Sequence, residues 1–251
     1  MSAEVDIQVF GSSGMLGQSV IRALERRGIR YEATRGDILL LSERDIRAPT
    51  VINCAGITHP SALPSTLFAV NTAGSIHLSR LCDSVRSRVV YISTDAIFSS
   101  PGPHFEDDPP SLQTVYARSK LYGEITYPPH VTLRGSFVGR EKGVVEDLLQ
   151  GKAVRVSRNA LWSGMWVDEF AELIVDVACR PEITGLLHVP GHGQSRIDLV
   201  TFLKGRLRSR SPLIVDDTVV WDRRLQSHFW SSYGLPTPGP FSEQFDRWEG
   251  R

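Results

Sequence analysis

The sequence lacks the features that mark membrane proteins, nucleic-acid-binding proteins and disulfide scaffolds. Its apolar runs are only a few residues long, far short of the roughly 20 that cross a bilayer. Its 28 basic residues equal its 28 acidic ones, so no net charge attracts nucleic acid or an anionic membrane. The three cysteines (Cys54, Cys82 and Cys179) are odd in number, far apart and match no metal spacing. No basic stretch followed by an apolar one opens the chain, so we expect no secretory signal and a reduced, cytoplasmic protein.

What the chain does contain begins with the pattern that opens a dinucleotide-binding domain. An apolar run at residues 7–10 ends at Gly11, Gly14 and Gly17, and apolar residues then recur at helical spacing until Gly28. Such glycines allow a tight turn, close approach of the backbone to pyrophosphate, and close helix–strand packing. The first N–H groups of the helix then face the phosphate charge. We expect a bound dinucleotide here; a glycine turn without a ligand is the less favoured alternative.

The end of the second predicted strand, residues 30–33, bears on the choice of cofactor. An acidic residue just past this strand would bind the free ribose hydroxyl of NAD, but Thr34 and Arg35 stand there. Arg35 suits the extra phosphate of NADP, because a guanidinium matches phosphate oxygens in a fork. An ordinary solvated arginine carries equal weight. NADP(H) is therefore favoured, and NAD(H) stays open.

Three further apolar runs, at residues 50–53, 89–92 and 131–134, predict buried parallel strands. Small residues follow the first of them, where open α/β sheets bind cofactors close to the backbone. A helix beginning near residue 67 contains Asn71, which is most simply explained as bonding to a neighbouring loop. The stretch 101–110 is rich in Pro, Gly and Asp and is predicted to be a loop.

Tyr116 and Lys120 lie four residues apart and would share one face of a helix. A permanent cation beside the phenol would lower its pKa from about 10, so that Tyr116 could exchange a proton with a substrate oxygen at neutral pH. Thr94, at the end of the preceding strand, could converge on the same point, although such residues also end strands or cap helices. The simpler alternative is an amphipathic helix with Tyr116 half buried and Lys120 in water.

Beyond residue 134 the alternation of strands and helices loosens. Asp168 begins a helix, residues 185–189 form a strand, and Ser195 with Asp198 resembles a capping box. Aromatic residues in the tail would seal a core, or alternatively form a substrate lid: Trp221, Phe229, Trp230, Phe241 and Trp248. We predict an α/β fold: a Rossmann-type doubly wound parallel sheet in residues 1–134, and a smaller, irregular substrate-binding region in residues 135–251 that partly interleaves with the sheet.

Together these motifs resemble the extended branch of the short-chain dehydrogenase/reductase superfamily, and within it the family of dTDP-4-dehydrorhamnose reductase and related sugar-nucleotide reductases. The resemblance runs from about residue 7 to residue 207, with its motifs in family order at residues 11–17, 36–38, 53–56, 93–95, 116–124, 133–137 and 185–189. It implies an NAD(P)H-dependent oxidoreductase that reduces a keto sugar nucleotide in deoxysugar biosynthesis. The implied partner is a small-molecule sugar nucleotide rather than nucleic acid or a membrane, and a homodimer is left open.

The resemblance also implies roles for individual residues. Tyr116 would donate a proton to the keto oxygen, Thr94 would hydrogen-bond that oxygen, and Lys120 would hold the nicotinamide ribose and keep the phenol's pKa low. Besides Tyr116 and Lys120, the expected cofactor-binding residues are Gly11, Ser12, Ser13, Gly14, Met15, Leu16, Gly17, Arg35, Asp37, Ile38, Cys54, Ala55, Gly56, Asn71 and Ser93. Besides Thr94, the residues expected at the sugar are Ser136 and Phe137. No metal is implied, and the seven histidines show no ligand spacing.

Departures from the family pattern leave the sugar open. The stretch from residue 37 to residue 50 is short, Phe137 replaces the usual tryptophan, and Gly139 follows Val138 without the usual aromatic residue. Ala96 stands where a dehydratase of the superfamily has Glu, which argues against elimination of water. An epimerase of the superfamily and a non-catalytic NADP-binding regulatory subunit remain as alternatives; the intact Tyr116 and Lys120 favour an enzyme over the latter.

Overall fold

The structure is a computed structural model that describes residues 5–59, 61–140 and 142–249. The chain divides into two compact units. The first runs up to residue 97 and also includes residues 112–134 and 171–187; the second includes residues 98–111, 135–170 and those from 188 onward. The domain boundary expected between residues 134 and 135 stays a prediction.

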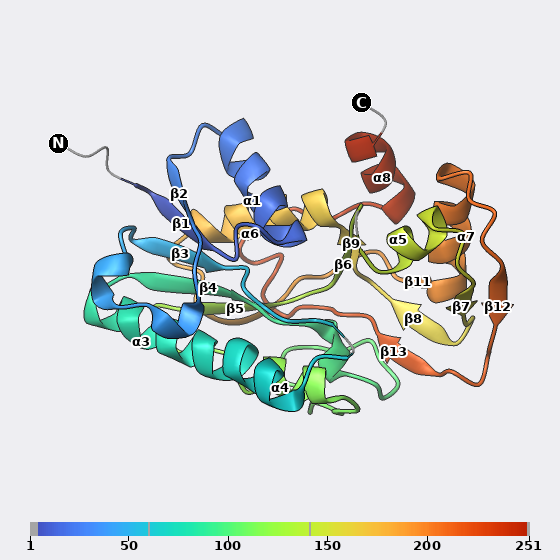
Figure 1. Ribbon diagram of the computed structural model, residues 1–251, viewed down its shortest axis with the longest axis horizontal. Helices are drawn as coiled ribbons and strands as arrows, with labels where there is room; N and C mark the ends of the chain where they lie inside the picture. Colours follow the sequence, from blue (N-terminus) through green and yellow to red (C-terminus); the bar gives the residue numbers. More distant parts are fainter. Residues whose placement is uncertain (1–4, 60, 141, 250–251) are drawn as a thin grey trace. The chain divides into compact units, whose positions relative to one another are not determined.

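The first unit is built on a six-stranded sheet with the order β10-β5-β4-β3-β1-β2 (Figure 1). The strands are β1 (Ile7–Phe10), β2 (Tyr31–Thr34), β3 (Thr50–Asn53), β4 (Arg88–Ile92), β5 (Val131–Arg134) and β10 (Gly185–His188). Neighbouring strands from β2 to β5 pair in parallel. β1, β4 and β5 are buried along their whole length, as expected for a parallel sheet covered on both faces. The order of strands reverses at β1 and β3, which makes their carboxyl ends a topological switch point, where such sheets bind ligands.

Helices cover both faces of this sheet. They are α1 (Met15–Arg26), α2 (Pro64–Phe68), α3 (Ser75–Ser84), α4 (Val115–Leu121) and α6 (Val167–Ala178), of which the part from Ala171 belongs to the first unit. In Figure 1, α1 and α6 lie on one face and α3 on the other. Arg27, the C-cap of α1, donates hydrogen bonds to Glu172 and Asp176 of α6. The predicted Rossmann-type doubly wound sheet is confirmed.

The short stretch between β2 and β3 contains no helix among the described residues, only the two 3₁₀ turns η1 (Ile38–Leu40) and η2 (Glu43–Asp45). An additional parallel strand between β2 and β3 would need its own residues and a second crossover of about a dozen residues or more. The segment is too short for that strand and two crossovers, so β2 forms the edge of the sheet.

The described residues of the second unit form small sheets and short helices around an aromatic core. Its sheets have the orders β11-β8-β13, β12-β7 and β6-β9. The strands are β6 (Phe137–Val138), β7 (Val154–Val156), β8 (Ala160–Trp162), β9 (Met165–Trp166), β11 (Gln194–Ser195), β12 (Leu213–Val215) and β13 (Trp221–Arg223). The helices are α5 (Val144–Leu149), α7 (Arg196–Arg206) and α8 (Phe241–Glu249).

Most aromatic residues of the tail belong to the core of this second unit. Phe245 of α8 meets Trp166 edge-on, with ring centroids 5.1 Å apart, and Phe241 packs in the same cluster. Trp230 is buried, whereas Phe229 is 46% exposed. Core formation therefore accounts for these side chains, with the exception of Phe229, as the first of the two interpretations predicts.

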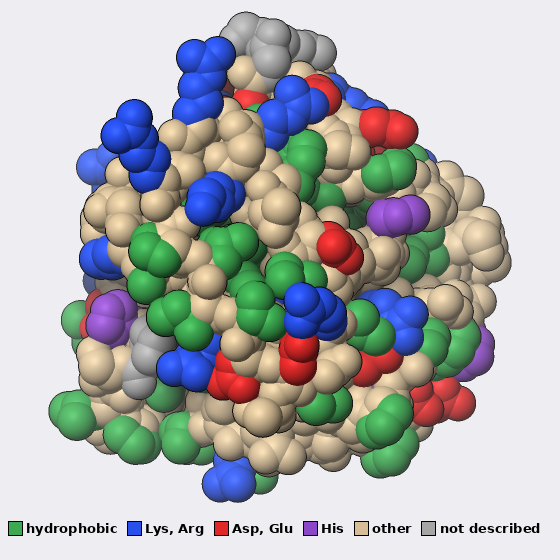
Figure 2. Space-filling model, turned by 90° about the vertical axis from the view of Figure 1, so that its right-hand side faces the viewer, with side chains coloured by type: hydrophobic (Ala, Val, Ile, Leu, Met, Phe, Trp, Pro, Cys, Tyr) green, Lys and Arg blue, Asp and Glu red, His purple; other side chains and the backbone are tan. Residues whose placement is uncertain are grey.

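The surface reflects the balanced charge of the sequence. In the lower half of the face drawn in Figure 2, basic and acidic side chains lie next to one another with hydrophobic side chains scattered between them. Within the described residues, every helix is too short or too polar to cross a membrane.

Candidate active site

Two of the three glycines at the β1–α1 turn and the start of α1 are required by packing inside the protein. Gly11 has a φ of +73°, and a Cβ atom there would lie 2.4 Å from the backbone nitrogen of Ala55. A Cβ atom at Gly17 would lie 2.3 Å from the carbonyl oxygen of Gly11. At Gly14 it would meet only that same oxygen, at 3.4 Å, which is an ordinary contact. Internal packing therefore does not explain Gly14, and its missing side chain leaves room at the start of α1.

The amino end of α1 has the properties of an anion-binding site. Gly14 is the N-cap, no side chain caps the helix, and the first turn contains no acidic residue. The Ser12 hydroxyl donates to the carbonyl of Thr34, so it holds the loop to β2, while Ser13 is exposed. The first N–H groups of the helix thus remain available for a negatively charged group.

The turn after β3 brings Gly56 close to Lys120 and Asn71. The Asn53 side chain accepts a hydrogen bond from the Ala55 nitrogen at 3.0 Å, which fixes the turn. A Cβ atom at Gly56 would lie 3.4 Å from the Asn71 side-chain oxygen and 3.8 Å from Lys120 Nζ. The carboxyl end of β3, α4 and the helical segment of Asn71 therefore meet at one point.

Cys54 lies in the same turn and is not a nucleophile. Burial raises the pKa of its thiol to about 12. The positive charge of Lys120 opposes this shift but does not overcome it. The Cys54 thiol therefore stays protonated at neutral pH. What Cys54 contributes to this turn is a small side chain.

Lys120 is buried, so its placement in water, the simpler sequence-based alternative, is wrong. Lys120 is only 6% exposed, and its Nζ atom lies 4.2 Å from the centre of the Tyr91 ring. Burial lowers the pKa of Lys120 to about 7, and the negative charge of Glu124 offsets only part of this shift. The sequence analysis expected a permanent cation at this position, whereas burial disfavours the charged form of Lys120.

The pKa of Lys120 predicts a pH dependence of stability. Since it lies near 7 in the folded chain and near 10.5 in the unfolded chain, the unfolded state binds more protons between these values. The free energy of unfolding, measured by urea titration without cofactor, should therefore rise between about pH 7 and pH 10 relative to that of Lys120→Met. Lys152→Met, at a residue whose side chain is 59% exposed, is the control and should parallel the wild type. Parallel curves for wild type and Lys120→Met would contradict the burial argument.

Asn71 lies in a π-helical segment, η3 (Ala69–Gly74), between α2 and α3. Its side-chain oxygen accepts from the Ile57 nitrogen at 2.8 Å, and its amide donates to the Ile57 carbonyl and to the Ser119 hydroxyl, both at 3.0 Å. The expected bond to a neighbouring loop is thus present. π-helical turns often occur at functional sites, and here the turn carries the side chain that links the β3 loop to α4.

Contacts with backbone carbonyl groups hold α4, the helix that contains Lys120, against the π-helical segment η3. The Tyr91 hydroxyl donates to the carbonyl of Asn71 at 3.1 Å and lies 3.3 Å from the carbonyl of Lys120. At Gly123 the packing is so tight that a Cβ atom would lie 2.0 Å from the Asn71 carbonyl oxygen. Tyr91 and Gly123 therefore position Lys120, although the sequence alone suggested no role for Tyr91.

Tyr116 lies on the same helix as Lys120, and Thr94 lies next to an element that packs against this helix. Tyr116 is half buried one turn before Lys120 on α4, whose N-cap Thr114 accepts a hydrogen bond from the Ala117 nitrogen. Thr94 is buried at the carboxyl end of β4, and its hydroxyl accepts from the Ala96 nitrogen at 3.1 Å. The 3₁₀ turn η4 (Asp95–Ile97), directly after Thr94, packs against α4. The three expected catalytic residues thus lie on two elements in contact.

Arg134 and Glu124 form a buried ion pair to which the sequence analysis assigned no role. Arg134 donates to both oxygens of Glu124, at 2.9 and 2.8 Å, and both side chains are 6% exposed. The Ser93 hydroxyl donates to the same carboxylate at 2.6 Å. Ser93, expected at the cofactor, therefore has its hydroxyl engaged by Glu124. The pair ties the ends of β4 and β5 to the chain just after α4.

Of the residues expected at the cofactor beyond β2, Arg35 and Asp37 are exposed and Ile38 is buried. β2 ends at Thr34, one residue later than predicted, so Arg35 is the first residue beyond it and is exposed. The Asp37 side chain accepts from the Leu39 nitrogen and caps η1, and Ile38 is buried against Gly74.

Ser136 and Phe137, expected at the sugar, belong to the second unit. The Ser136 hydroxyl accepts from the Trp162 indole at 2.8 Å, and the Phe137 ring stacks on Phe170 with centroids 5.5 Å apart. Both side chains are half buried and take part in the packing of this unit.

Comparison with known proteins places this arrangement in a family. The model of the RmlD substrate binding domain family matches residues 5–204. The dTDP-4-dehydrorhamnose reductase of Mycobacterium tuberculosis is 30% identical over 211 residues, which are 74% of this chain and 69% of that protein. The spore coat polysaccharide biosynthesis protein SpsK of Bacillus subtilis is 26% identical over 210 residues, 74% of each chain.

Solved structures agree in fold. The dTDP-4-dehydrorhamnose reductase of Bacillus anthracis, in complex with NADP, superposes with a TM-score of 0.83 at 17% identity and covers 98% of this chain and 99% of its own. The Bordetella bronchiseptica enzyme WbmG, in complex with NAD and UDP, does so with a TM-score of 0.80 at 18% identity, covering 98% and 96%. The fold, the match over residues 5–204 and the relative at 30% identity lead to one conclusion: the chain belongs to the RmlD substrate binding domain family.

Proposed function

We propose that this protein is a reductase that transfers a hydride from a nicotinamide dinucleotide to the keto carbon of a sugar nucleotide, in the synthesis of a deoxysugar. The observation that carries this proposal is the placement of Lys120: buried, beside Gly56 and Asn71, and one helical turn after Tyr116. Relatives named dTDP-4-dehydrorhamnose reductase and dTDP-4-keto-6-deoxy-D-glucose reductase support the same chemistry.

The glycine turn supports binding of a dinucleotide. Gly14 has no packing reason to lack a side chain, and the α1 N-terminus offers N–H groups without a capping side chain. A pyrophosphate would accept hydrogen bonds there. Arg35 follows β2 and favours NADP over NAD, because no acidic residue stands at that strand end to bind a free ribose hydroxyl.

Residues of α4 and at the end of β4 would supply the proton and stabilise the charge that develops on the keto oxygen. When bound, the reduced nicotinamide supplies the hydride, and the keto oxygen must gain a proton to become a hydroxyl. The Tyr116 phenol donates that proton, and the Thr94 hydroxyl stabilises the charge that develops on the oxygen. Lys120 in its protonated form stabilises the phenolate left on Tyr116. A lysine whose pKa is about 7 can then exchange the proton with solvent near neutral pH.

The experiment that tests the proposal is oxidation of NADPH and NADH by the purified protein with several 4-keto sugar nucleotides, followed by identification of the product. Consumption of one cofactor per sugar reduced, with faster turnover of NADPH, is the expected result. If the protein binds NADPH but reduces none of the sugars, a regulatory NADP-binding subunit replaces the reductase. An inverted but unreduced sugar would instead identify an epimerase.

A further inference from the structure

An open cavity, which we call the amino-end cavity, lies where three strands of the first unit begin. Ile7, Thr50 and Arg88, the first residues of β1, β3 and β4, line it together with the end of α6. It is therefore at the edge of the sheet opposite to the glycine turn and Thr94, and the proposed reaction makes no use of it. Its volume of about 600 Å³ is enough for a small organic molecule.

The walls of this cavity are largely apolar. Apolar side chains come from Ile7, Ile29, Pro49, Pro129, Ala178 and Pro181. Of the polar lining residues, Ser87 donates its hydroxyl to the carbonyl of Ala48, and Asp6 accepts two hydrogen bonds from Arg30, at 3.0 and 2.7 Å. The carboxylate of Asp6 is thus already engaged by a cation from outside the lining.

Arg88 brings a buried positive charge to the cavity, and no carboxylate pairs with it in the described structure. The residue is 4% exposed, and its terminal nitrogens donate to the carbonyls of Arg180 and Ile183 at 2.8 and 2.9 Å. Its Nε atom is buried without a hydrogen-bond partner. Burial lowers the pKa of Arg88, and only the charge of the exposed Glu182 opposes this shift. Two neutral carbonyl groups do not compensate fully for a buried charge, so an anion beside this guanidinium would be stabilising.

Arg86 adds a second guanidinium to the same cavity. Its side chain is exposed and, among the described residues, forms no hydrogen bond or ion pair. Arg86 and Arg88 thus give the cavity two positive charges, while its acidic residue is paired elsewhere.

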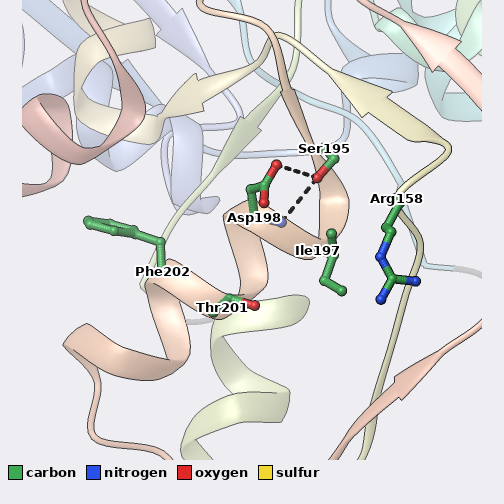
Figure 3. Close-up of a pocket in the computed structure, with 6 residues that line it drawn as sticks. All are labelled: Arg158, Ser195, Ile197, Asp198, Thr201 and Phe202. Atoms are coloured by element: carbon green, nitrogen blue, oxygen red, sulfur yellow. Dashed lines mark hydrogen bonds between the residues drawn. The ribbon is translucent and has the colours of Figure 1, made fainter.

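The cavity on α7 in the second unit differs in this respect (Figure 3). It has a volume of about 740 Å³ and is lined by Arg158, Ser195, Ile197, Asp198, Thr201 and Phe202. The Ser195 hydroxyl caps α7 and bonds to the Asp198 carboxylate, a variant of the expected capping box, and Arg158 pairs with Asp217. These ionic groups therefore have partners within the protein, unlike the two arginines of the amino-end cavity.

We propose that the amino-end cavity is a second ligand site, which binds a small carboxylate with an apolar body. The apolar part would cover Ile7, Ile29 and the prolines, which removes apolar surface from water. The carboxylate would lie against Arg88 and Arg86 and supply the negative charge that they lack, because a guanidinium matches carboxylate oxygens in a fork. The site is distinct from the cofactor and sugar sites and does not depend on the proposed reduction.

Cys179 lines the same cavity and can report whether it is occupied. Its thiol is exposed, whereas burial raises the pKa of the Cys54 and Cys82 thiols to about 12, so these two stay unreactive near neutral pH. A ligand in the cavity should therefore slow the alkylation of Cys179 by N-ethylmaleimide, which mass spectrometry of the protein measures.

The test uses the full chain saturated with NADPH, and 2-naphthoate as the probe. Naphthoate should protect Cys179 with a Kd of about 1 mM or tighter. 2-Naphthamide, which has the same shape without the charge, should bind at least about tenfold more weakly, and acetate, which lacks the apolar body, should not protect. Equal protection by the amide and the carboxylate would overturn the proposal. Protection that disappears as NADPH is added would also overturn it, because the naphthoate would then act from the cofactor site.

Arg86→Gly removes one of the two charges without threatening the fold. It should weaken naphthoate binding about threefold to tenfold. Its melting temperature should equal or exceed that of the wild type, because Arg86 directly follows the C-cap of α3 with a φ of +59°, which glycine adopts without strain. The matched control is Arg208→Gly in the second unit, an exposed arginine that directly follows the C-cap of α7 with a φ of +50°. It should show the same thermal effect and leave protection of Cys179 unchanged.

Arg88→Met removes the buried charge and should abolish protection of Cys179 by naphthoate. This variant also loses two contacts with carbonyl groups, so its melting temperature is measured first. Where Arg88→Met does not fold, the comparison of Arg86→Gly with Arg208→Gly decides. Equal naphthoate affinity in these two glycine variants would refute the proposed site.

Discussion

Tyr116→Phe should lower kcat by roughly 100- to 10,000-fold, the usual contribution of a positioned general acid. Phenylalanine keeps the half-buried aromatic ring on α4 but lacks the hydroxyl proton that the keto oxygen must receive. Since Lys120 and the glycine turn are untouched, NADPH affinity should stay within about twofold. Steady-state turnover of the keto sugar nucleotide, together with a fluorescence titration of NADPH, measures both quantities.

The matched control for this substitution is Tyr122→Phe, which removes a hydroxyl from a tyrosine at the end of the same helix. Tyr122 is exposed and stacks on Phe68, so its hydroxyl takes part in no step of the proposed reaction. Its turnover should match the wild type. Near-normal turnover by Tyr116→Phe would remove Tyr116 from the mechanism and leave the family membership intact.

Arg134→Met should lower the free energy of unfolding by about 3–5 kcal/mol, a larger loss than breaking an exposed ion pair would cause. The substitution leaves the buried Glu124 carboxylate with the Ser93 hydroxyl and without the two donors of the guanidinium. Uncompensated buried charge costs far more than the pair itself contributes. Urea denaturation followed by circular dichroism gives the value.

Two further variants separate the charge from the packing. Glu124→Gln combined with Arg134→Met removes the stranded charge, so the double variant should be more stable than Arg134→Met alone. Arg206→Met breaks an exposed pair with Asp246 and should cost less than about 1 kcal/mol. Equal losses for Arg134→Met and Arg206→Met would mean that the buried pair does not hold β4 and β5 to the end of α4.

The first half of the chain was predictable because its signals are local. The glycine spacing before α1 and the continuous apolar runs of β3 and β4 each report one element, and parallel sheets assemble such elements in few ways. Tyr116 and Lys120 were predicted from their helical spacing together with the motifs that precede them. The burial of Lys120 was not predictable, because it depends on Tyr91 and Asn71, which come from other parts of the sequence.

The second unit gave weaker signals for a physical reason. Its strands, such as β6 and β9, are only two residues long, too short for a hydrophobic period to appear. The π-helical turn around Asn71 was equally hidden, since its sequence continues the pattern of an ordinary helix.

The close approach of Gly123 to the Asn71 carbonyl locks two backbone segments together before any ligand arrives. The chain just after α4 is thereby held against η3, and the Tyr91 hydroxyl bonds to the Asn71 carbonyl beside it. A backbone fixed in this way lowers the entropy that ordering Lys120 would cost, so the cofactor contact that we propose for Lys120 gains from preorganisation.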